Sequence, residues 1–171
     1  MYYYIFAAPM ENGIVDKKLK AADSVCFNIK SCWHAIARMY NNGGMEYDLS
    51  ASTGYVLLNI DTENGINATK IAPLLGMESR SLTRTLKSLE EQELIYRQPD
   101  DVDKRQVKIF LTQKGKKKKD IARRGVKTFN ALIKERVGEQ DLRVFFKVIN
   151  QVNETVGTIT HLKLNQKVNT N

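Results

Sequence analysis

The chain has 171 residues, a formal net charge of +8 and an isoelectric point near 9.5. Hydrophobic residues make up 42% of it, enough to bury one core, and no apolar run approaches the roughly 18 residues of a membrane span. We therefore expect no membrane partner. The excess of Lys and Arg suits a surface that binds phosphates, but other basic cytosolic proteins share it.

Residues 1–16 are predicted to be an N-terminal extension, of which residues 1–9 are either an added segment or a mis-assigned start. They are apolar at first but lack the basic leader of a signal peptide, which favours a cytoplasmic location. A long helix is predicted over residues 17–42, and the sequence Asn-Asn-Gly-Gly at 41–44 ends it. A second helix follows from about Ser50 to Ile60. The long helix carries one apolar face, formed by Val25, Ile29, Trp33, Ile36 and Tyr40.

The next segment, from residue 66, predicts a helix-turn-helix. A short apolar helix ends at Gly76, and a second helix begins at Ser79, whose hydroxyl is expected to cap it. Leu82, Leu86 and Leu89 recur at helical spacing and predict a buried stripe. The opposite face offers groups that bind base edges and phosphates, namely Ser79, Arg80, Ser81, Thr83, Arg84 and Lys87. Taken alone, this helix is more typical of a solvated amphipathic helix that carries some basic residues.

A β-hairpin is predicted directly afterwards, and it favours the DNA-binding interpretation. Its strands span residues 94–97 and 106–111, and Pro99 marks the loop between them. The loop tip presents three charged residues, Asp103, Lys104 and Arg105. A long basic side chain on such a tip can enter a minor groove, and the acidic neighbour is expected to hold it extended. Helix-turn-helix and hairpin together describe a winged helix that reads duplex DNA.

Two further helices are predicted after the hairpin. Thr112 is expected to cap the first, which reaches Val137, and Gly138 separates it from a second helix that runs from Asp141 to about Leu162. The second helix carries an apolar stripe at spacings of three and four residues, consisting of Leu142, Phe145, Ile149, Val152, Val156 and Ile159. Such a stripe is a core or a subunit interface, and we favour a dimer interface.

Lysines are densest at the start of the first of these helices, at position 114 and at positions 116–119. The helix dipole disfavours cations there, and a nearby phosphate backbone would compensate. A solvated basic face is an equally good interpretation. We assign Lys117 to a phosphate contact.

Five short segments resemble the MarR family of bacterial transcriptional regulators. They lie at residues 82–84 (Leu-Thr-Arg), 89–90 (Leu-Glu), 94–97 (Leu-Ile-Tyr-Arg), 103–105 (Asp-Lys-Arg) and 111–115 (Leu-Thr-Gln-Lys-Gly). The resemblance extends over residues 17–162. It implies a winged-helix dimer in which Arg105 enters the minor groove and Arg84 occupies a frequent arginine position of the recognition helix.

Two residues depart from the family pattern. Glu93 stands where the family usually has Gly before the wing, which predicts a strained or reshaped turn. Pro73 lies inside the first helix of the motif, where it removes a backbone donor and is expected to kink the helix.

The resemblance also implies a small effector, often aromatic, bound between the dimer helices and the DNA-binding module. Trp33, Tyr40 and Tyr55 are candidates to line this pocket, although aromatic residues at helical spacing are more often core. Cys26 resembles in placement the reactive cysteine of the OhrR-like peroxide sensors within the family. We prefer a buried, structural thiol for it.

The sequence contains no catalytic or metal-binding pattern that we recognise. HExxH, P-loop and Rossmann glycine motifs are missing from it, and Cys26, Cys32 and His34 match no zinc spacing. The two cysteines are six residues apart and face different sides of a helix, so they should not form a bridge. We expect no enzymatic activity, no cofactor and no metal.

The sequence thus predicts a mainly α protein with a small β-wing, in which a winged helix-turn-helix is joined to a helical dimerisation region. The DNA-binding domain is assigned to residues 46–112, the dimerisation segments to residues 17–45 and 113–164, and a disordered tail to residues 165–171. We expect a homodimeric repressor that binds a pseudo-palindromic operator in double-stranded DNA and is released by a small aromatic or phenolic effector. The alternatives are a redox-sensing regulator that uses Cys26 and a DNA architectural protein without sequence specificity. The predicted DNA-binding residues are Ser79, Arg80, Ser81, Thr83, Arg84, Lys87, Arg97, Asp103, Lys104, Arg105 and Lys117.

Overall fold

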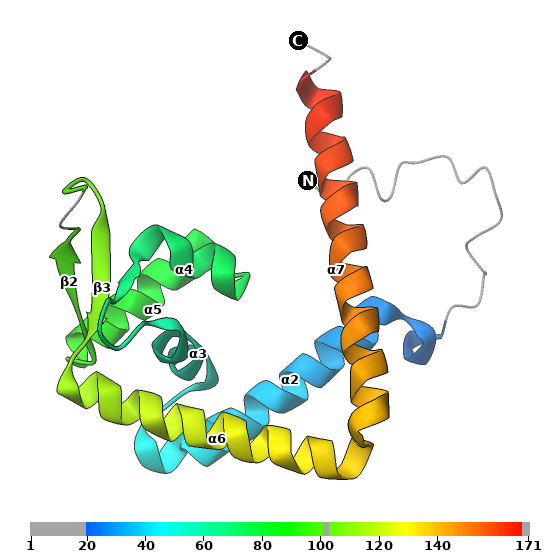
Figure 1. The fold of residues 1–171 in the computed structure, drawn as a ribbon, viewed down its shortest axis with the longest axis horizontal. Coiled ribbons are helices and arrows are strands. Elements are labelled where there is room, and N and C mark those ends of the chain that lie inside the picture. Colours follow the sequence, from blue (N-terminus) through cyan, green and yellow to red (C-terminus); the bar gives the residue numbers. More distant parts are fainter. Residues whose placement is uncertain (1–19, 101–102, 169–171) are drawn as a thin grey trace. The chain divides into compact units, whose positions relative to one another are not determined.

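A computed structural model describes residues 20–100 and 103–168 of the chain, and the chain divides into two compact units, Met1–Lys118 and Lys119–Asn171. Figure 1 shows a mostly helical chain with one small sheet. The elements in order are η1 (Ala21–Asp23), α2 (Val25–Gly44), η2 (Met45–Tyr47), α3 (Ala51–Asn59), β1 (Ile66–Asn67), α4 (Ala68–Leu75), α5 (Ser79–Glu91), β2 (Ile95–Pro99), β3 (Val107–Leu111), α6 (Gln113–Val137) and α7 (Glu139–Val168).

The first unit has a single core, which the helix-turn-helix and the sheet enclose. The side chains of this core that are 0% exposed include Val56 and Leu57 of α3, Ile60 at its C-cap, Ile71 of α4 and Ile109 of β3. The predicted leucine stripe of α5 is buried in this core, which confirms the helical periodicity: the stripe consists of Leu82, Leu86 and Leu89. Burial of this apolar face fixes α5 against α3 and α4 and leaves its polar face outward.

The wing is a three-stranded antiparallel sheet in the order β1-β3-β2. Ile66 of β1 pairs with Ile109, and Ile95 of β2 pairs with Leu111. Pro99 was predicted to lie in the loop but belongs to β2, where it pairs with Val107. Because β2 is an edge strand, the missing N–H of proline costs the sheet no hydrogen bond on its free side.

Side-chain caps begin most of the helices of the first unit. Ser24 accepts the N–H of Phe27 at the start of α2, and Ser50 accepts that of Thr53 at the start of α3. α2 therefore begins at Val25 rather than at residue 17, and it ends at Gly44, two residues beyond the prediction. The predicted cap of α5 is wrong: Glu78 is the N-cap residue, without a side-chain hydrogen bond, and Ser79 is the first residue of the helix.

Both helices of the helix-turn-helix end in a Schellman motif. In α4 the N–H groups of Gly76 and Met77 donate to Pro73 and Ala72 carbonyls, and Gly76 takes φ 59°. At the end of α5, Glu93 and Leu94 donate to the carbonyls of Glu90 and Leu89 in the same way.

The left-handed residue of the second motif is Glu93, at φ 59°, so the strained turn predicted from its departure from the family pattern is confirmed.

Glu93→Gly is expected to raise the free energy of unfolding by about 0.5–1 kcal/mol, because glycine adopts the left-handed conformation without a steric cost at Cβ. Urea denaturation measures the change. Gly76→Ala is the matched control: its Cβ would meet nothing within 4 Å, so only backbone strain should lower its stability. Equal stability of Glu93→Gly and the wild type would contradict this account.

The second unit contains the greater part of α6 and all of α7. Gly138, at φ 83°, separates the two helices as predicted. α7 begins at Glu139, two residues before the prediction, and its backbone remains helical to Val168. Residues 165–168 of the predicted disordered tail are thus helical, and residues 169–171 lie outside the described residues, as do residues 1–19 at the other end. None of the described helices combines the length and apolar character needed to cross a bilayer.

Candidate nucleic-acid interface

The outer face of α5 is polar and unobstructed within the described chain. All six residues predicted on this face are exposed: Ser79, Arg80, Ser81, Thr83, Arg84 and Lys87. Arg80 and Arg84 form no ion pair with any described residue, so their guanidinium donors are available to a ligand. The hydroxyl of Thr83 donates to the carbonyl of Ser79 at 2.8 Å and therefore offers an outside partner only an acceptor.

Two predicted DNA-binding cations are instead paired inside the module. Arg97 of β2 places Nε 2.9 Å from Oε2 of Glu90 on α5, which ties the wing to the helix. Lys87 lies 3.8 Å from Glu91 one turn later, and both side chains are highly exposed. The exposed pair with Lys87 is weak and readily exchanged for a phosphate, whereas the hydrogen-bonded geometry of Arg97 favours a positioning role.

The wing tip is a tight turn that presents Lys104 and Arg105 at its two central positions. The N–H of Gln106 donates to the carbonyl of Asp103 at 2.8 Å and closes the turn. Oδ1 of Asp103 accepts the backbone N–H of Arg105 at 3.1 Å. We expected Asp103 to hold the side chain of Arg105, and this is wrong: it shapes the turn through the backbone. Lys104 and Arg105 are exposed and unpaired among the described residues.

The lysine cluster at the start of α6 is not a uniform phosphate-binding face. Lys114 donates to the carbonyl of Gln92 at 2.9 Å, at the C-terminal end of α5. Lys118 donates to the carbonyls of Tyr47 and Asp48, where η2 ends. Lys119 is only 7% exposed. Lysines are favourable at helix C-termini, so much of this cluster serves the fold, and Lys117 remains exposed.

The three aromatic residues predicted to line an effector pocket lie together. The ring of Tyr55, on α3, is 5.4 Å from Trp33 and 6.3 Å from Tyr40, both on α2. Trp33 remains 47% exposed, so the cluster is not part of the core. Burial raises the pKa of both tyrosines, and the neighbouring Tyr55 adds to the shift at Tyr40. Both phenols are therefore neutral at pH 7 and can donate a hydrogen bond.

Comparison with known proteins agrees with this geometry. The family model described as MarR family matches residues 49–107. The HTH-type transcriptional regulator SarZ of Staphylococcus aureus is 33% identical over 122 residues, which cover 71% of this chain and 78% of SarZ. This chain belongs to the MarR family. It is a DNA-binding transcriptional regulator of the winged-helix class.

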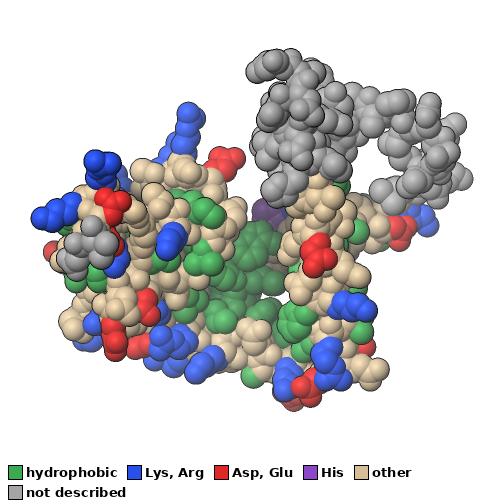
Figure 2. All heavy atoms as spheres, turned by 45° about the horizontal axis from the view of Figure 1, so that its top comes forward, with side chains coloured by type: hydrophobic (Ala, Val, Ile, Leu, Met, Phe, Trp, Pro, Cys, Tyr) green, Lys and Arg blue, Asp and Glu red, His purple; other side chains and the backbone are tan. Residues whose placement is uncertain are grey.

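Solved structures of MarR-type regulators share the fold. The transcriptional regulator SlyA matches with a TM-score of 0.70 and 26% identity, covering 78% of this chain and 94% of SlyA. The structure of the MepR–DNA complex from S. aureus matches with a TM-score of 0.72 and 17% identity, covering 80% of this chain and 99% of MepR. Figure 2 shows Lys and Arg side chains projecting from the winged-helix unit of this MarR-family chain.

Three residues of this MarR-family site were missed by the sequence interpretation. A side-chain hydrogen bond between Asn67 and Gln106 joins the wing to the start of α4, and Asp100 accepts the backbone N–H of Asp103 within the wing. Asn67 could have been found, because Asn before a helix is a typical N-cap. The pairing of Asn67 with Gln106 spans 39 residues, and no local pattern signals it.

Lys117→Ala and Lys118→Ala are expected to separate DNA binding from stability. Lys117→Ala should weaken binding to operator and scrambled DNA alike, by less than an arginine substitution in the wing, and leave the free energy of unfolding unchanged. Lys118→Ala should lower the free energy of unfolding by about 1 kcal/mol, because two carbonyls lose their donor. Binding across a salt series and urea denaturation test the pair. Identical behaviour of the two variants would contradict the assignment.

Proposed function

We propose that this regulator is a homodimer that binds a pseudo-palindromic operator, acts as a repressor and leaves the DNA when a small aromatic ligand binds. The observation that supports this proposal most strongly is that one winged-helix unit with a single core exposes both the polar face of α5 and a basic wing tip. A helix in the major groove and an arginine in the minor groove account for the two elements. In this proposal Arg84 and Arg80 contact base edges or phosphates, and Arg105 enters the minor groove.

The dimer is supported by large apolar side chains that each unit leaves exposed. On α2 these are Val25, Phe27, Ile29 and Trp33, between 43% and 55% exposed. On α7 they include Val144, Phe145, Phe146 and Val156, between 52% and 57% exposed. Soluble monomers rarely leave this much clustered apolar surface in water, and a two-fold partner would cover it.

Sedimentation at micromolar concentration tests the dimer. The expected mass is twice the 19.5 kDa of the chain. Phe145→Asp should shift the protein toward monomer, whereas Asn150→Asp, an exposed polar residue of the same helix, should not. A wild-type protein that sediments as a monomer under these conditions would contradict both the dimer and the binding of a two-fold symmetric operator.

The effector is proposed to contact the aromatic cluster of Trp33, Tyr40 and Tyr55. The ring contacts within the cluster support this proposal. A second support is a structural neighbour with 22% identity and a TM-score of 0.62, CouR, whose structure contains p-coumaroyl-CoA, a ligand with a phenolic ring. Trp33 is the only tryptophan of the chain, so its fluorescence reports on this site. We expect p-coumaroyl-CoA to quench it in the wild type and to do so more weakly in Tyr55→Ala. Unchanged Trp33 fluorescence in the wild type would contradict the proposal that the effector belongs to this ligand class.

A redox-sensing regulator that uses Cys26 is the second candidate. Both cysteines are exposed in the described chain, so the expected burial of Cys26 is wrong, and an oxidant can reach this thiol in a single chain. Cys26 lies in the first turn of α2. Release from DNA by peroxide that Cys26→Ser abolishes and Cys32→Ser preserves would establish this version over the effector-released one. Release that is insensitive to peroxide would exclude it.

A further inference from the structure

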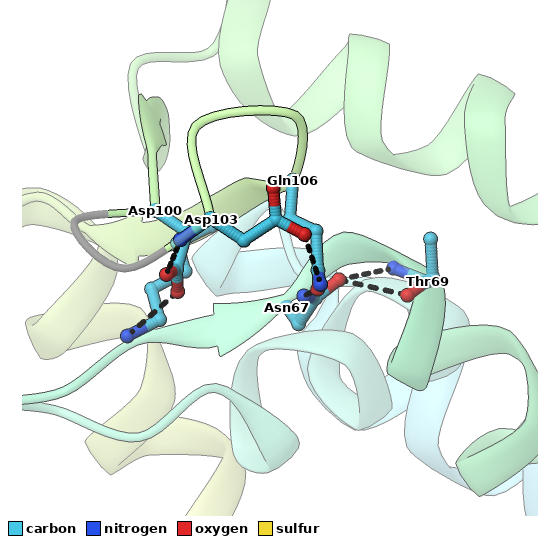
Figure 3. A network of polar contacts seen from close by, with 6 residues as sticks. Asn67, Thr69, Asp100, Asp103 and Gln106 are labelled. Atoms are coloured by element: carbon cyan, nitrogen blue, oxygen red, sulfur yellow. Dashed lines mark hydrogen bonds and ion pairs between the residues drawn. The ribbon is translucent and has the colours of Figure 1, made fainter.

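A run of side-chain hydrogen bonds connects the first helix of the helix-turn-helix to the wing tip (Figure 3). Asn67 caps α4 by accepting the N–H and the hydroxyl of Thr69 at 3.1 and 2.8 Å. Its Nδ2 donates to Oε1 of Gln106, whose Nε2 donates to Oδ2 of Asp103 at 3.0 Å. Asp103 in turn accepts the backbone N–H of Arg105. The run therefore ends at the arginine proposed to enter the minor groove.

The two ends of this run fix its direction. At the helix end the backbone N–H of Thr69 can only donate, so Asn67 must turn its carbonyl oxygen to α4 and its amide nitrogen to Gln106. At the wing end the carboxylate of Asp103 can only accept, so Gln106 must turn its amide nitrogen to it. Each amide has one satisfying orientation, and reversing either costs a hydrogen bond.

The run rests on buried groups at its base. Asn67 is 9% exposed and belongs to β1, which pairs with β3. Asp100 accepts the backbone N–H of Asp103 at 3.0 Å, and its other oxygen lies 3.2 Å from Nζ of Lys108. The side chain of Asp100 is only 13% exposed. A turn tied from two sides to the sheet and to α4 has less freedom to move relative to α5.

We infer that Asn67 and Gln106 are positioning residues for the DNA contact of Arg105. They hold the wing turn at a fixed place relative to α4, and α4 shares a core with the recognition helix α5. The backbone of Arg105 is thus already ordered before the side chain enters the minor groove, which lowers the entropic cost of binding. This inference rests on the proposed role of Arg105 in the minor groove.

Reversing the run provides a sharp test. Asn67→Asp keeps the cap of α4 but places an acceptor against Gln106, and Asp103→Asn keeps the turn but places a donor against it. Each single variant leaves one bond unmade and should weaken operator binding by roughly two- to tenfold. In the double variant Gln106 can turn around, every bond is restored in the opposite direction, and affinity should return to within about twofold of the wild type.

A charge effect alone gives a different result. Asn67→Asp adds a negative charge near the DNA and Asp103→Asn removes one, so charge predicts weaker binding for the first and tighter binding for the second. Combining each single variant with Arg105→Ala separates positioning from a purely structural role. If Asn67 and Gln106 act through Arg105, both single variants should lose their effect on affinity in the Arg105→Ala protein, whereas a purely structural role would leave that effect unchanged. Thermal unfolding of every variant is followed in parallel.

The outcomes separate this inference from the proposed function. Weakening by both single variants, recovery in the double variant and loss of the effect without Arg105 support the inference. Tighter binding by Asp103→Asn, or equal effects with and without Arg105, overturns it. If the wild type prefers the operator over scrambled DNA and both single variants bind the operator as tightly as the wild type, the inference is overturned but the proposed function is not. A wild type that binds operator and scrambled DNA equally overturns the proposed function, and the inference with it.

Discussion

Arg84→Ala is expected to weaken binding to the operator by roughly 1–3 kcal/mol and to relax the preference at one base position. The reason is geometric: Arg84 is exposed on α5, opposite the buried leucine stripe, and has no ion-pair partner among the described residues. A guanidinium in this position can form two hydrogen bonds to a guanine edge. Binding to scrambled DNA should change much less than binding to the operator.

Arg105→Ala is expected to act differently, because a minor groove is recognised by its width and potential more than by its bases. Binding to many sequences should weaken together, and the slope of log affinity against log salt should fall by about one unit. Both arginine variants are to be measured on operator and scrambled DNA across a salt series. Arg143→Ala, an exposed arginine of α7, is the control for a general loss of positive charge. If both variants bind the operator like the wild type, the assignment of α5 and the wing to DNA is wrong.

Gly115→Ala is expected to lower the free energy of unfolding by about 3 kcal/mol. A Cβ at this position would lie 1.9 Å from the carbonyl oxygen of Leu94 and 2.9 Å from its carbon, so the backbone of α6 or of the connection between α5 and β2 would have to move. Gly115 is buried, and its N–H donates to Thr112, the cap that begins α6. The residue before β2 and the first turn of α6 meet where only a glycine fits.

Gly43→Ala is the matched control for this substitution. Gly43 also lies in a helix, but its Cβ would meet nothing within 4 Å. Its free energy of unfolding should stay unchanged or rise by up to about 1 kcal/mol, because alanine has the higher helix propensity. Urea denaturation at one fixed protein concentration compares the two variants, since a dimer gains stability with concentration. A Gly115→Ala protein as stable as Gly43→Ala would contradict the close approach of the backbones.

The features that periodicity controls were predicted from the sequence. The stripe of Leu82, Leu86 and Leu89 is buried because a helix repeats every 3.6 residues, and apolar groups at that spacing leave water together. The strained turn at Glu93 was predicted from the glycine that the MarR family usually has at this position, whereas the break at Gly138 follows from backbone stereochemistry, which is local. Predictions of this kind need only neighbours along the chain.

The features that depend on distant partners were not predicted. Lys118 belongs to a cluster for which a phosphate contact and a solvated face were equally good interpretations, but it donates to carbonyls about 70 residues earlier in the chain. Arg97 looked available for DNA, but the fold places Glu90 of α5 beside it. Asp103 and Gln106 likewise show their roles only once β1 is paired with β3. Charged side chains find their partners through tertiary structure, which residue spacing does not encode.

Selection of binding sites from random double-stranded DNA tests the central claim most directly. A homodimeric winged helix that reads bases with α5 should enrich an inverted repeat with two half-sites related by a two-fold axis, and Arg84→Ala should relax one position in each half-site. The wing should protect the minor groove beside each half-site. Retention of DNA without enrichment of any sequence, or enrichment of a single half-site by a monomer, would contradict the account.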